Sequence, residues 1–292
     1  MTTLRRLVWA VVPAALALAV SAACATDVEN PAVAQGTEPS AAEATDVAPT
    51  TTTTPVPPGG RQPTPADPLR VVLAGDSVMN GLAPAVATAL NEGGDSQVQF
   101  DLAPSIARDT ASRVLWQQQL ETTRPDLVVM LIGTWERGDA NFQPGDPNWA
   151  PQYQAQVLDP FAEMVTDAGA QILWIGMPAV ESGADTLQLV ALNSQFRALA
   201  ERDDDVDYVE GGDYLNGPDG GYTDRLPGAD GTLERVRRLD GLHLCPEGSE
   251  RLAVPVLEYA QQQWNVAVAP GWETMPWREP PTLDKPEECP PV

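Results

Sequence analysis

Two kinds of hydrophobic pattern alternate between residues 69 and 265. Short, uninterrupted apolar runs are typical of strands that are buried on both faces of a sheet. Between them lie longer segments whose apolar residues recur every three or four positions, as on one face of a helix. The pattern predicts strands at 69–74, 98–102, 127–132, 171–177 and 206–209, and helices at 82–90, 110–123, 151–168, 186–202 and 246–264.

This alternation of strands and helices over short links predicts an α/β fold. We expect a doubly wound, three-layer α/β/α sandwich around a mostly parallel sheet of five strands. A hydrophobic content of 43% is sufficient for a substantial core. Residues 266–292 are rich in Pro and Trp and too irregular for a regular element. Their apolar side chains, Trp272 and Trp277 among them, predict a tail that packs on the domain.

Residues 1–23 have the features of an export signal. Arg5 and Arg6 precede an apolar stretch at 7–20, and small residues then lead to Cys24. This ending resembles a bacterial lipobox, after which the cysteine is lipid-modified. A plain cleaved signal and a retained anchor helix are the alternatives, although the stretch is short for a membrane span of about 20 residues. We expect an exported lipoprotein, anchored through Cys24 on the outer face of the cell membrane.

Residues 24–68 differ in composition from the rest of the chain. Pro, Thr, Ala, Gly and acidic residues dominate, and few side chains here could offset the entropy lost on ordering. This segment therefore predicts a disordered tether between the lipid anchor and the domain.

The chain is strongly acidic, with a formal net charge of −24. Nucleic acids would be repelled by this charge and are not expected as partners. A zinc site built from several Cys or His ligands is excluded, because His243 is the only histidine and no two cysteines have ligand spacing. We expect neither a metal nor a cofactor, although a carboxylate-only metal site remains open on composition alone.

The first predicted strand stops abruptly at Gly75-Asp76-Ser77. Glycine permits a sharp turn there, and Ser77 falls where the chain leaves the strand for a helix. In a parallel sheet this is the carboxyl edge, where ligands bind. The tripeptide alone is weak evidence, since most such sequences form ordinary turns.

A second cluster, Asp240-Gly241-Leu242-His243, lies just before the last predicted helix. Asp and His three residues apart on a turn can face the same way, so that the carboxylate orients the imidazole. A lone histidine is more often structural. Here its spacing from Asp240 and the presence of Ser77 in the same chain favour a catalytic triad. We expect Ser77 as nucleophile, His243 as general base and Asp240 as the residue that orients it.

Together these two blocks resemble those of the SGNH (GDSL-type) hydrolase superfamily. The resemblance implies a flavodoxin-like sheet and places the family's nucleophile, acid and base at Ser77, Asp240 and His243. The segments 124–136 and 237–248 also resemble bacterial SGNH domains, some of which are fused to membrane acyltransferases that modify cell-surface polymers. The resemblance covers residues 69–260.

Two departures from the family pattern concern the oxyanion hole. The family's Gly-x-Asn-Asp block reads here as Gly133-Thr134-Trp135-Glu136. The indole N–H of Trp135 can donate in place of the asparagine, but the ring could equally carry a sugar or pack in the core. The family's oxyanion glycine is also missing between Asp101 and Asp109. The resemblance suggests that the backbone N–H of Ser105 donates in its place. Ser105, Gly133 and Trp135 are the expected oxyanion and substrate residues.

Cys245 and Cys289 are expected to form a disulfide if the protein is exported. The bond would hold the tail across the domain and brace the loop of His243. The alternative is two buried free thiols.

The sequence therefore predicts an exported, monomeric serine esterase that removes O-acetyl or other short acyl groups from a cell-envelope polysaccharide through an acyl-serine. An acylated carbohydrate or a small ester is the expected partner. An O-acetyltransferase with the same triad and a catalytically degraded envelope-binding module are the alternatives.

Overall fold

The computed structural model describes residues 58–101, 106, 109–137, 144–279 and 285–292. The predicted signal at 1–23, its lipidation residue Cys24 and most of the predicted tether lie outside the described residues. Ser105 lies outside them as well.

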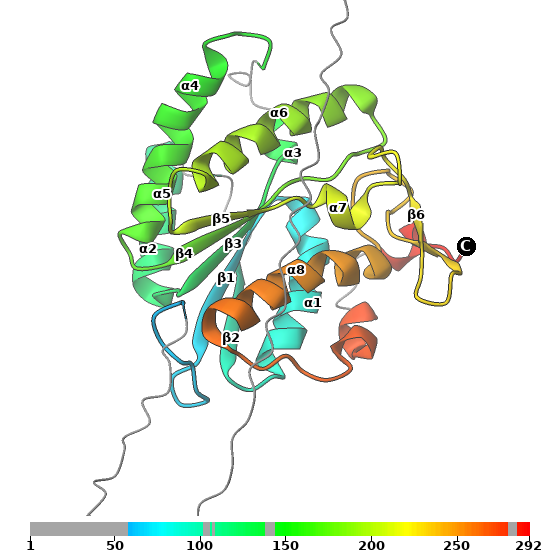
Figure 1. The fold of residues 1–292 in the computed structure, drawn as a ribbon, viewed down its shortest axis with the longest axis horizontal. Coiled ribbons are helices and arrows are strands. Elements are labelled where there is room, and N and C mark those ends of the chain that lie inside the picture. Colours follow the sequence, from blue (N-terminus) through cyan, green and yellow to red (C-terminus); the bar gives the residue numbers. More distant parts are fainter. Residues whose placement is uncertain (1–57, 102–105, 107–108, 138–143, 280–284) are drawn as a thin grey trace, which may run out of the picture. The chain divides into compact units, whose positions relative to one another are not determined.

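A five-stranded sheet forms the centre of the domain (Figure 1). Its strands are β1 (Leu69–Gly75), β2 (Ser96–Asp101), β3 (Leu127–Leu131), β4 (Gln171–Ile175) and β5 (Val206–Val209). They lie in the order β2-β1-β3-β4-β5, and every neighbouring pair is parallel. The predicted three-layer sandwich with a flavodoxin-like parallel sheet is thus confirmed. From β1 the chain first crosses to β2 on one side and then to β3 on the other, so the carboxyl ends of β1 and β3 flank the switch point of the sheet.

The helices occupy most of the positions that the sequence predicts. They are α1 (Ser77–Asn91), α2 (Thr110–Thr123), α3 (Thr134–Arg137), α4 (Trp149–Tyr153), α5 (Asp159–Thr166), α6 (Gly183–Ala200), α7 (Gly212–Leu215) and α8 (Pro246–Trp264). A π-helical turn (Gln154–Leu158) joins α4 to α5 within the helix predicted at 151–168. The hydrophobic pattern does not predict α3, α7 or the hairpin of β6 (Arg225–Pro227) and β7 (Leu233–Arg235).

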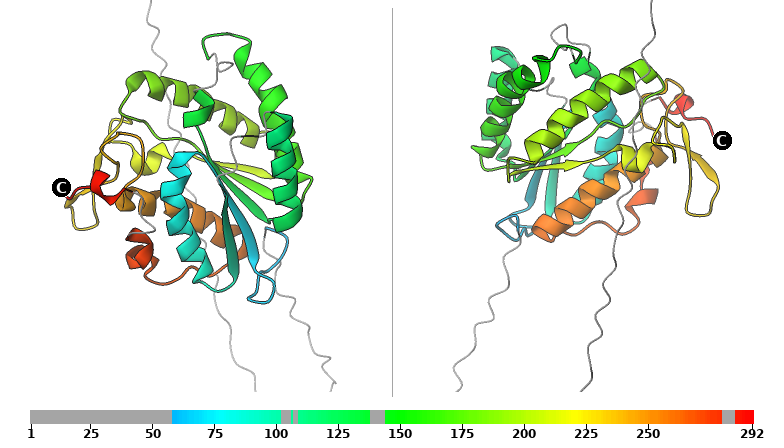
Figure 2. Two further views of the ribbon diagram at one scale, coloured as in Figure 1. Left: turned by 180° about the vertical axis from the view of Figure 1, so that it is seen from behind. Right: turned by 45° about the horizontal axis from the view of Figure 1, so that its top comes forward.

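Alternate residues of the central strands enter two separate cores. Val71 and Leu73 of β1 pack with buried side chains of α1 and α8, whereas Val72 and Ala74 pack with those of α2, α5 and α6. The helices therefore form one layer on each face of the sheet, as the two views of Figure 2 show. The central strands β1, β3 and β4 are covered on both faces, and their sequences are almost entirely apolar. The edge strands differ: Gln97 and Gln99 of β2 and Asp207 of β5 are exposed.

The domain begins earlier than the boundary at residue 69 that composition suggests. The guanidinium of Arg61 donates to both carboxylate oxygens of Asp126, at 3.0 and 2.6 Å. The carbonyl of Gly59 accepts the indole N–H of Trp264 at 3.1 Å. Residues 58–68 therefore pack against the domain through specific hydrogen bonds and ion pairs. The amino-acid composition of a segment does not predict such individual contacts.

The C-terminal segment also packs on the domain. Trp272 and Trp277 are buried, and the indole N–H of Trp277 donates to the carbonyl of Trp272 at 2.7 Å. Cys245 and Cys289 form the expected disulfide, with their Cα atoms 5.7 Å apart. Short 3₁₀ turns at Trp272–Thr274, Pro276–Arg278 and Pro286–Glu288 shape this segment. Over the described part of the chain, no helix has the length and hydrophobicity needed to cross a membrane.

Candidate active site

The turn from β1 into α1 places Ser77 at the carboxyl edge of the sheet. Asp76 caps α1, since its Oδ1 accepts the N–H of Val78 at 3.0 Å. A Cβ atom at Gly75 would lie 1.9 Å from the carbonyl oxygen of Leu131 on β3, so only glycine allows the two strands to meet so closely here. The helix consequently begins at Ser77, five residues before the apolar pattern indicates.

The same aspartate ties this turn to the turn after β3. Asp76 is fully buried, and its Oδ2 accepts the backbone N–H groups of Gly133 and Thr134 at 2.9 and 2.7 Å. The hydroxyl of Thr134 donates to the same oxygen. A carboxylate with this many donors satisfies its buried charge and fixes the two sides of the switch point relative to each other.

Ser77, His243 and Asp240 form one continuous hydrogen-bonded chain. His243 Nε2 lies 2.7 Å from Ser77 Oγ, and His243 Nδ1 lies 2.7 Å from Asp240 Oδ2. The side chains of His243 and Asp240 are 24% and 36% exposed, so the cluster is accessible from solvent. The structure thus brings together the three residues that the sequence singles out, although Ser77 is 166 positions from His243.

The loop of Asp240 and His243 is shaped by the aspartate itself. Asp240 Oδ1 accepts the backbone N–H groups of Leu242 and His243 at 2.9 and 3.0 Å, and Gly241 adopts a left-handed φ of 70°. Burial alone would raise the pKa of Asp240, but the hydrogen bonds from His243 and from these amides outweigh it and lower the pKa. An ionised carboxylate only accepts hydrogen bonds, so Nδ1 carries a proton and a neutral ring leaves Nε2 free to accept from Ser77.

The C-terminal segment braces this loop from outside. Cys245, two residues after His243, precedes α8 and is bonded to Cys289. The backbone N–H of Leu239 donates to the carbonyl of Glu288 at 3.0 Å. The tail is therefore attached to the loop covalently on one side of the Asp–His pair and by a backbone hydrogen bond on the other.

The predicted oxyanion residues have different environments. The N–H of Gly133 is already donated to Asp76, so it is not available to a substrate. Trp135 does not pack in the core: the residue is 44% exposed on α3. As the first residue of α1, Ser77 presents a backbone N–H that has no acceptor within the helix.

The short helix α3 is anchored through the residues on both sides of Trp135. Thr134 is bound to Asp76, and the buried carboxylate of Glu136 accepts the hydroxyl of Tyr153 at 3.0 Å. Arg137 forms an ion pair with Asp185 on α6 at 2.7 Å. These contacts hold the turn in place and leave the indole of Trp135 as its exposed apolar side chain.

Asn80 was not identified from the sequence. It lies one helical turn after Ser77, and its buried Oδ1 accepts no hydrogen bond in the described part of the chain. The signal available in the sequence was the i, i+3 spacing, which places Asn80 on the same side of α1 as Ser77. The structural role of Asp76 was also missed, although its tripeptide was recognised.

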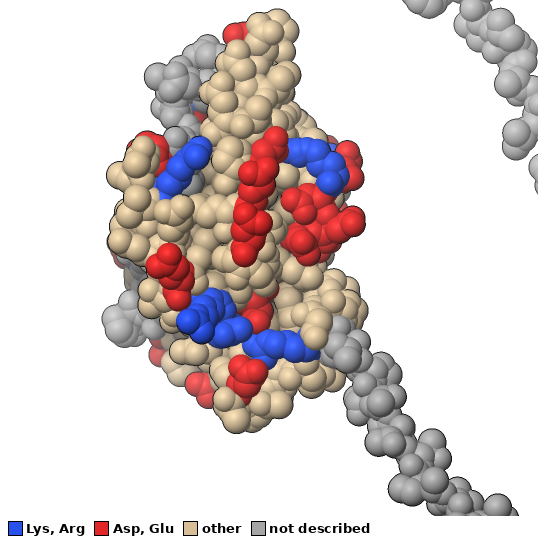
Figure 3. Space-filling view, turned by 90° about the vertical axis from the view of Figure 1, so that its left-hand side faces the viewer, with Lys and Arg blue, Asp and Glu red and all other residues tan. Residues whose placement is uncertain are grey.

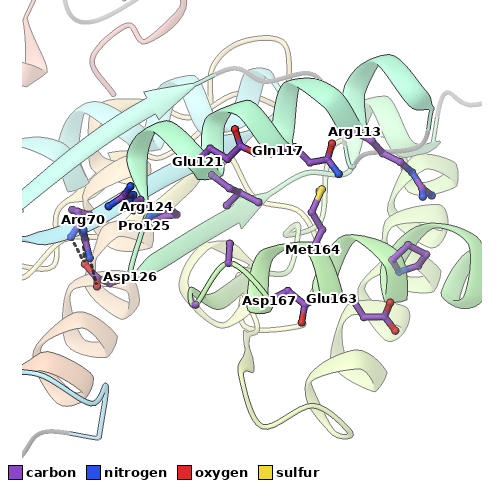
Figure 4. A pocket seen from close by; sticks show the side chains of 14 residues that line it. Arg70, Arg113, Gln117, Glu121, Arg124, Pro125, Asp126, Glu163, Met164 and Asp167 are labelled. Carbon is purple, nitrogen blue, oxygen red and sulfur yellow. Dashed lines mark hydrogen bonds and ion pairs between the residues drawn. The ribbon is translucent and has the colours of Figure 1, made fainter.

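A large hollow of about 850 Å³ lies elsewhere (Figure 4). It is lined by Arg70 and Asp126, at the amino ends of β1 and β3, and by side chains of α2 and α5. This is the edge of the sheet opposite Ser77.

Figure 3 shows a face of the molecule on which basic side chains stand beside acidic ones. Among the described residues, no group of three or more His, Cys, Asp or Glu side chains is arranged to hold a metal ion.

Residues 70–259 match the family described as Protein of unknown function (DUF459). The chain belongs to this family. The matched region is more than half of the chain and includes Ser77, Asp240 and His243. No curated protein matches the sequence.

Solved structures with a similar fold include several esterases and acyltransferases. A GDSL-like lipase from Bacteroides thetaiotaomicron has 14% identity and a TM-score of 0.44, over 66% of this chain and 88% of that one. The periplasmic domain of a lipopolysaccharide acetyltransferase from Salmonella ser. Paratyphi A has 15% identity and a TM-score of 0.46, over 65% and 83%. A family 3 carbohydrate esterase from Clostridium thermocellum has 15% identity and a TM-score of 0.43, over 66% and 94%.

Proposed function

We propose that this protein is an SGNH-type serine esterase. The observation that carries the proposal is the hydrogen-bonded chain Asp240–His243–Ser77, with 2.7 Å at each link. Heavy-atom distances of this size are those at which a general base removes a proton from a nucleophile.

The reaction proceeds in two halves. Ser77 Oγ attacks the ester carbonyl carbon while its proton moves to His243 Nε2, and Asp240 stabilises the imidazolium that forms. Collapse of the tetrahedral intermediate breaks the ester C–O bond, and His243 returns the proton to the departing alcohol. Water, deprotonated by the same histidine, then attacks the acyl-serine and releases the carboxylic acid together with free Ser77.

Negative charge on the carbonyl oxygen is stabilised at the N-terminus of α1. The backbone N–H of Ser77 is the donor there, and the helix dipole acts in the same direction. The asparagine usual for the family is absent, and Gly133 is engaged with Asp76. We therefore expect a slower enzyme than one with a complete oxyanion hole, because each lost donor costs about 10²–10³ in rate.

The proposed substrate is an O-acetyl or other short acyl ester on a carbohydrate of the cell envelope. The exposed indole of Trp135, held on the anchored turn of α3 beside Asp76, supports a sugar-binding role. The predicted export signal and the lipobox-like ending at Cys24 support a position on the outer face of the membrane. The disulfide between Cys245 and Cys289 is typical of that compartment.

The experiment that tests the proposal measures p-nitrophenolate release from p-nitrophenyl acetate by residues 54–292 and by Ser77→Ala. We expect loss of at least a thousandfold in the variant, since the nucleophile is removed. Equal rates would refute the serine mechanism and favour a non-catalytic binding module. Assays with an O-acetylated polysaccharide, with and without a sugar acceptor, then separate release of acetate from its transfer to the acceptor.

A further inference from the structure

Arg237 lies at the base of the loop that carries Asp240 and His243. Its side chain is among the largest that are fully buried, and only 1% of its surface is exposed. An antiparallel bridge between Arg237 and Leu244 closes the loop at its base. The guanidinium is therefore enclosed by protein next to this loop, and the proposed mechanism gives it no role.

The contacts of Arg237 differ from those of the arginines beside it in the sequence. Arg235 forms an ion pair with Asp224 at 2.7 Å, and Arg238 lies 3.9 Å from a carboxylate oxygen of Glu288. Arg237 has no ion pair within the described residues, and its Nε has no acceptor there. Burying an arginine without an ion pair costs free energy, because its charge is removed from water.

The contacts that Arg237 does make connect two loops. Its Nη1 and Nη2 lie 3.5 and 3.4 Å from the carbonyl oxygens of Leu242 and Ala179. Leu242 immediately precedes His243, and Ala179 belongs to the loop after β4. A backbone hydrogen bond of 3.1 Å from Glu181 to Gly241 joins the same two loops. The guanidinium thus lies between the Asp–His loop and the carboxyl edge of the sheet.

The charge of Arg237 acts on acidic groups of several elements. Burial lowers the pKa of Arg237 to about 10, while the charges of Tyr222 and Asp240 oppose that decrease. The side chain therefore stays cationic near neutral pH. Tyr222 in turn lies within the electrostatic reach of Asp224 and Glu181. Arg238 and Glu288 lie beside the same loop, 3.9 Å apart.

We propose that Arg237 is a positioning residue for the reaction: its guanidinium holds the Asp240–His243 loop against the loop after β4 and supplies positive charge behind the Asp240 carboxylate. This inference rests on the proposed function. The charge disfavours proton binding by the Asp240–His243 pair, which keeps the base unprotonated toward lower pH. The contacts to the two carbonyls keep Nε2 within reach of Ser77.

The test compares Arg237→Met and Arg237→Lys with Arg235→Met, which removes a buried arginine from the same segment but farther from the loop. For Arg237→Met on p-nitrophenyl acetate, we expect kcat to fall about tenfold to a hundredfold with KM changed less than about threefold. The acidic limb of its rate profile should move up by about 0.5 pH unit. Arg237→Lys should keep the limb in place and recover only part of kcat.

A second readout does not depend on activity. His243 is the only histidine, so the NMR signal of its ring is unambiguous in a protein without a histidine tag. The titration midpoint of this signal should rise in Arg237→Met and stay at the wild-type value in Arg237→Lys and Arg235→Met. If Arg237→Met does not fold, the kcat of Arg237→Lys decides, and a wild-type value would overturn the proposal.

The outcomes separate the two hypotheses. Suppose that the wild-type enzyme hydrolyses the ester and that Arg237→Met matches Arg235→Met in kcat, in the acidic limb of the rate profile and in the ring titration. Arg237 would then have only a packing role, and the proposal would be overturned. A wild-type protein with no esterase activity would refute the proposed function, whereas the ring titration would still report whether Arg237 acts on His243.

Discussion

Asp76 and Thr134 join the two sides of the switch point, with the Thr134 N–H 2.7 Å from the buried Oδ2 of Asp76. The same oxygen accepts the hydroxyl of Thr134 and the N–H of Gly133. Because Ser77 directly follows Asp76, the position of the nucleophile depends on these bonds.

Replacement of Asp76 by Asn is expected to lower both stability and activity. An amide in this position would direct at least one N–H group toward donors, so we expect the free energy of unfolding to fall by about 2–3 kcal/mol. Urea denaturation measures this change. Thr134→Val, which removes only one of the bonds, is the matched control and should cost about 1 kcal/mol. Wild-type stability in Asp76→Asn would contradict this role.

The disulfide should matter to both the fold and the loop of His243. Cys289→Ser releases a tail that is closed by a bond across 44 positions, and we expect a loss of about 2–4 kcal/mol. The rate on p-nitrophenyl acetate should also fall, since the contact of Leu239 with Glu288 is loosened. The double variant Cys245→Ser/Cys289→Ser is the control for a stray thiol. Retention of wild-type rate and stability in both variants would refute the bracing role.

The ion pairs of Asp126 predict a defined pH dependence. Burial would raise the pKa of Asp126, but hydrogen bonds and charge from Arg61 and Arg70 lower it. Because the pKa of Asp126 is lower in the folded than in the unfolded protein, the ionised carboxylate stabilises the fold at pH values above its unfolded-state pKa of about 4. This stabilisation is lost as the pH falls through the folded-state pKa. Asp126→Asn should therefore cost about 2–3 kcal/mol at pH 7, and the difference from wild type should shrink in acid.

Urea denaturation of wild type and Asp126→Asn, from pH 7 down to pH values below about 4, measures this difference in stability. Asp67→Asn is the control, because Asp67 lies 3.3 Å from the same Arg61 but its side chain is 72% exposed. Such a pair contributes little. A difference between wild type and Asp126→Asn that is independent of pH would exclude the ionised carboxylate as its cause.

Variants of Trp135 separate a sugar platform from an oxyanion donor. If Trp135 is a platform on which a sugar ring stacks, Trp135→Ala should raise KM for an acetylated polysaccharide about tenfold. Trp135→Phe keeps an aromatic ring, so its KM should stay near the wild-type value. For an oxyanion donor, Trp135→Phe should lose about 10²–10³ in kcat on every ester, because the indole N–H is gone. The exposure of Trp135 leads us to expect the first result. Leu233→Ala, an exposed apolar residue on β7, is the control.

The sheet and its main helices were predictable because their signals are local. Strands such as 127–132 are buried on both faces and read as continuous apolar runs, and the helices between them carry one apolar stripe. The turn at Gly75-Asp76-Ser77 indicated where α1 starts, whereas the apolar pattern placed the helix at 82–90, because the Asp76 cap rather than that pattern determines the first residue. The π turn at Gln154–Leu158 and the β6–β7 hairpin likewise leave no clear periodic signal.

The three residues of the candidate site were identifiable from short motifs at Ser77 and Asp240–His243. Their surroundings were not, because these depend on contacts between distant segments. The bonds from Asp76 to Thr134 span 58 positions, and the contact from Arg237 to Ala179 spans another 58. No property of either residue alone indicates such a partner, which is defined only once the sheet order brings the loops together.

The most direct test of the account is labelling of the protein with a fluorophosphonate probe, followed by intact mass and peptide mapping. A serine activated by His243 should take up one probe per molecule at Ser77, and Ser77→Ala and His243→Ala should take up none. Failure of the folded wild-type protein to react, or labelling at another residue, would contradict the central claim that Ser77, His243 and Asp240 form a working triad.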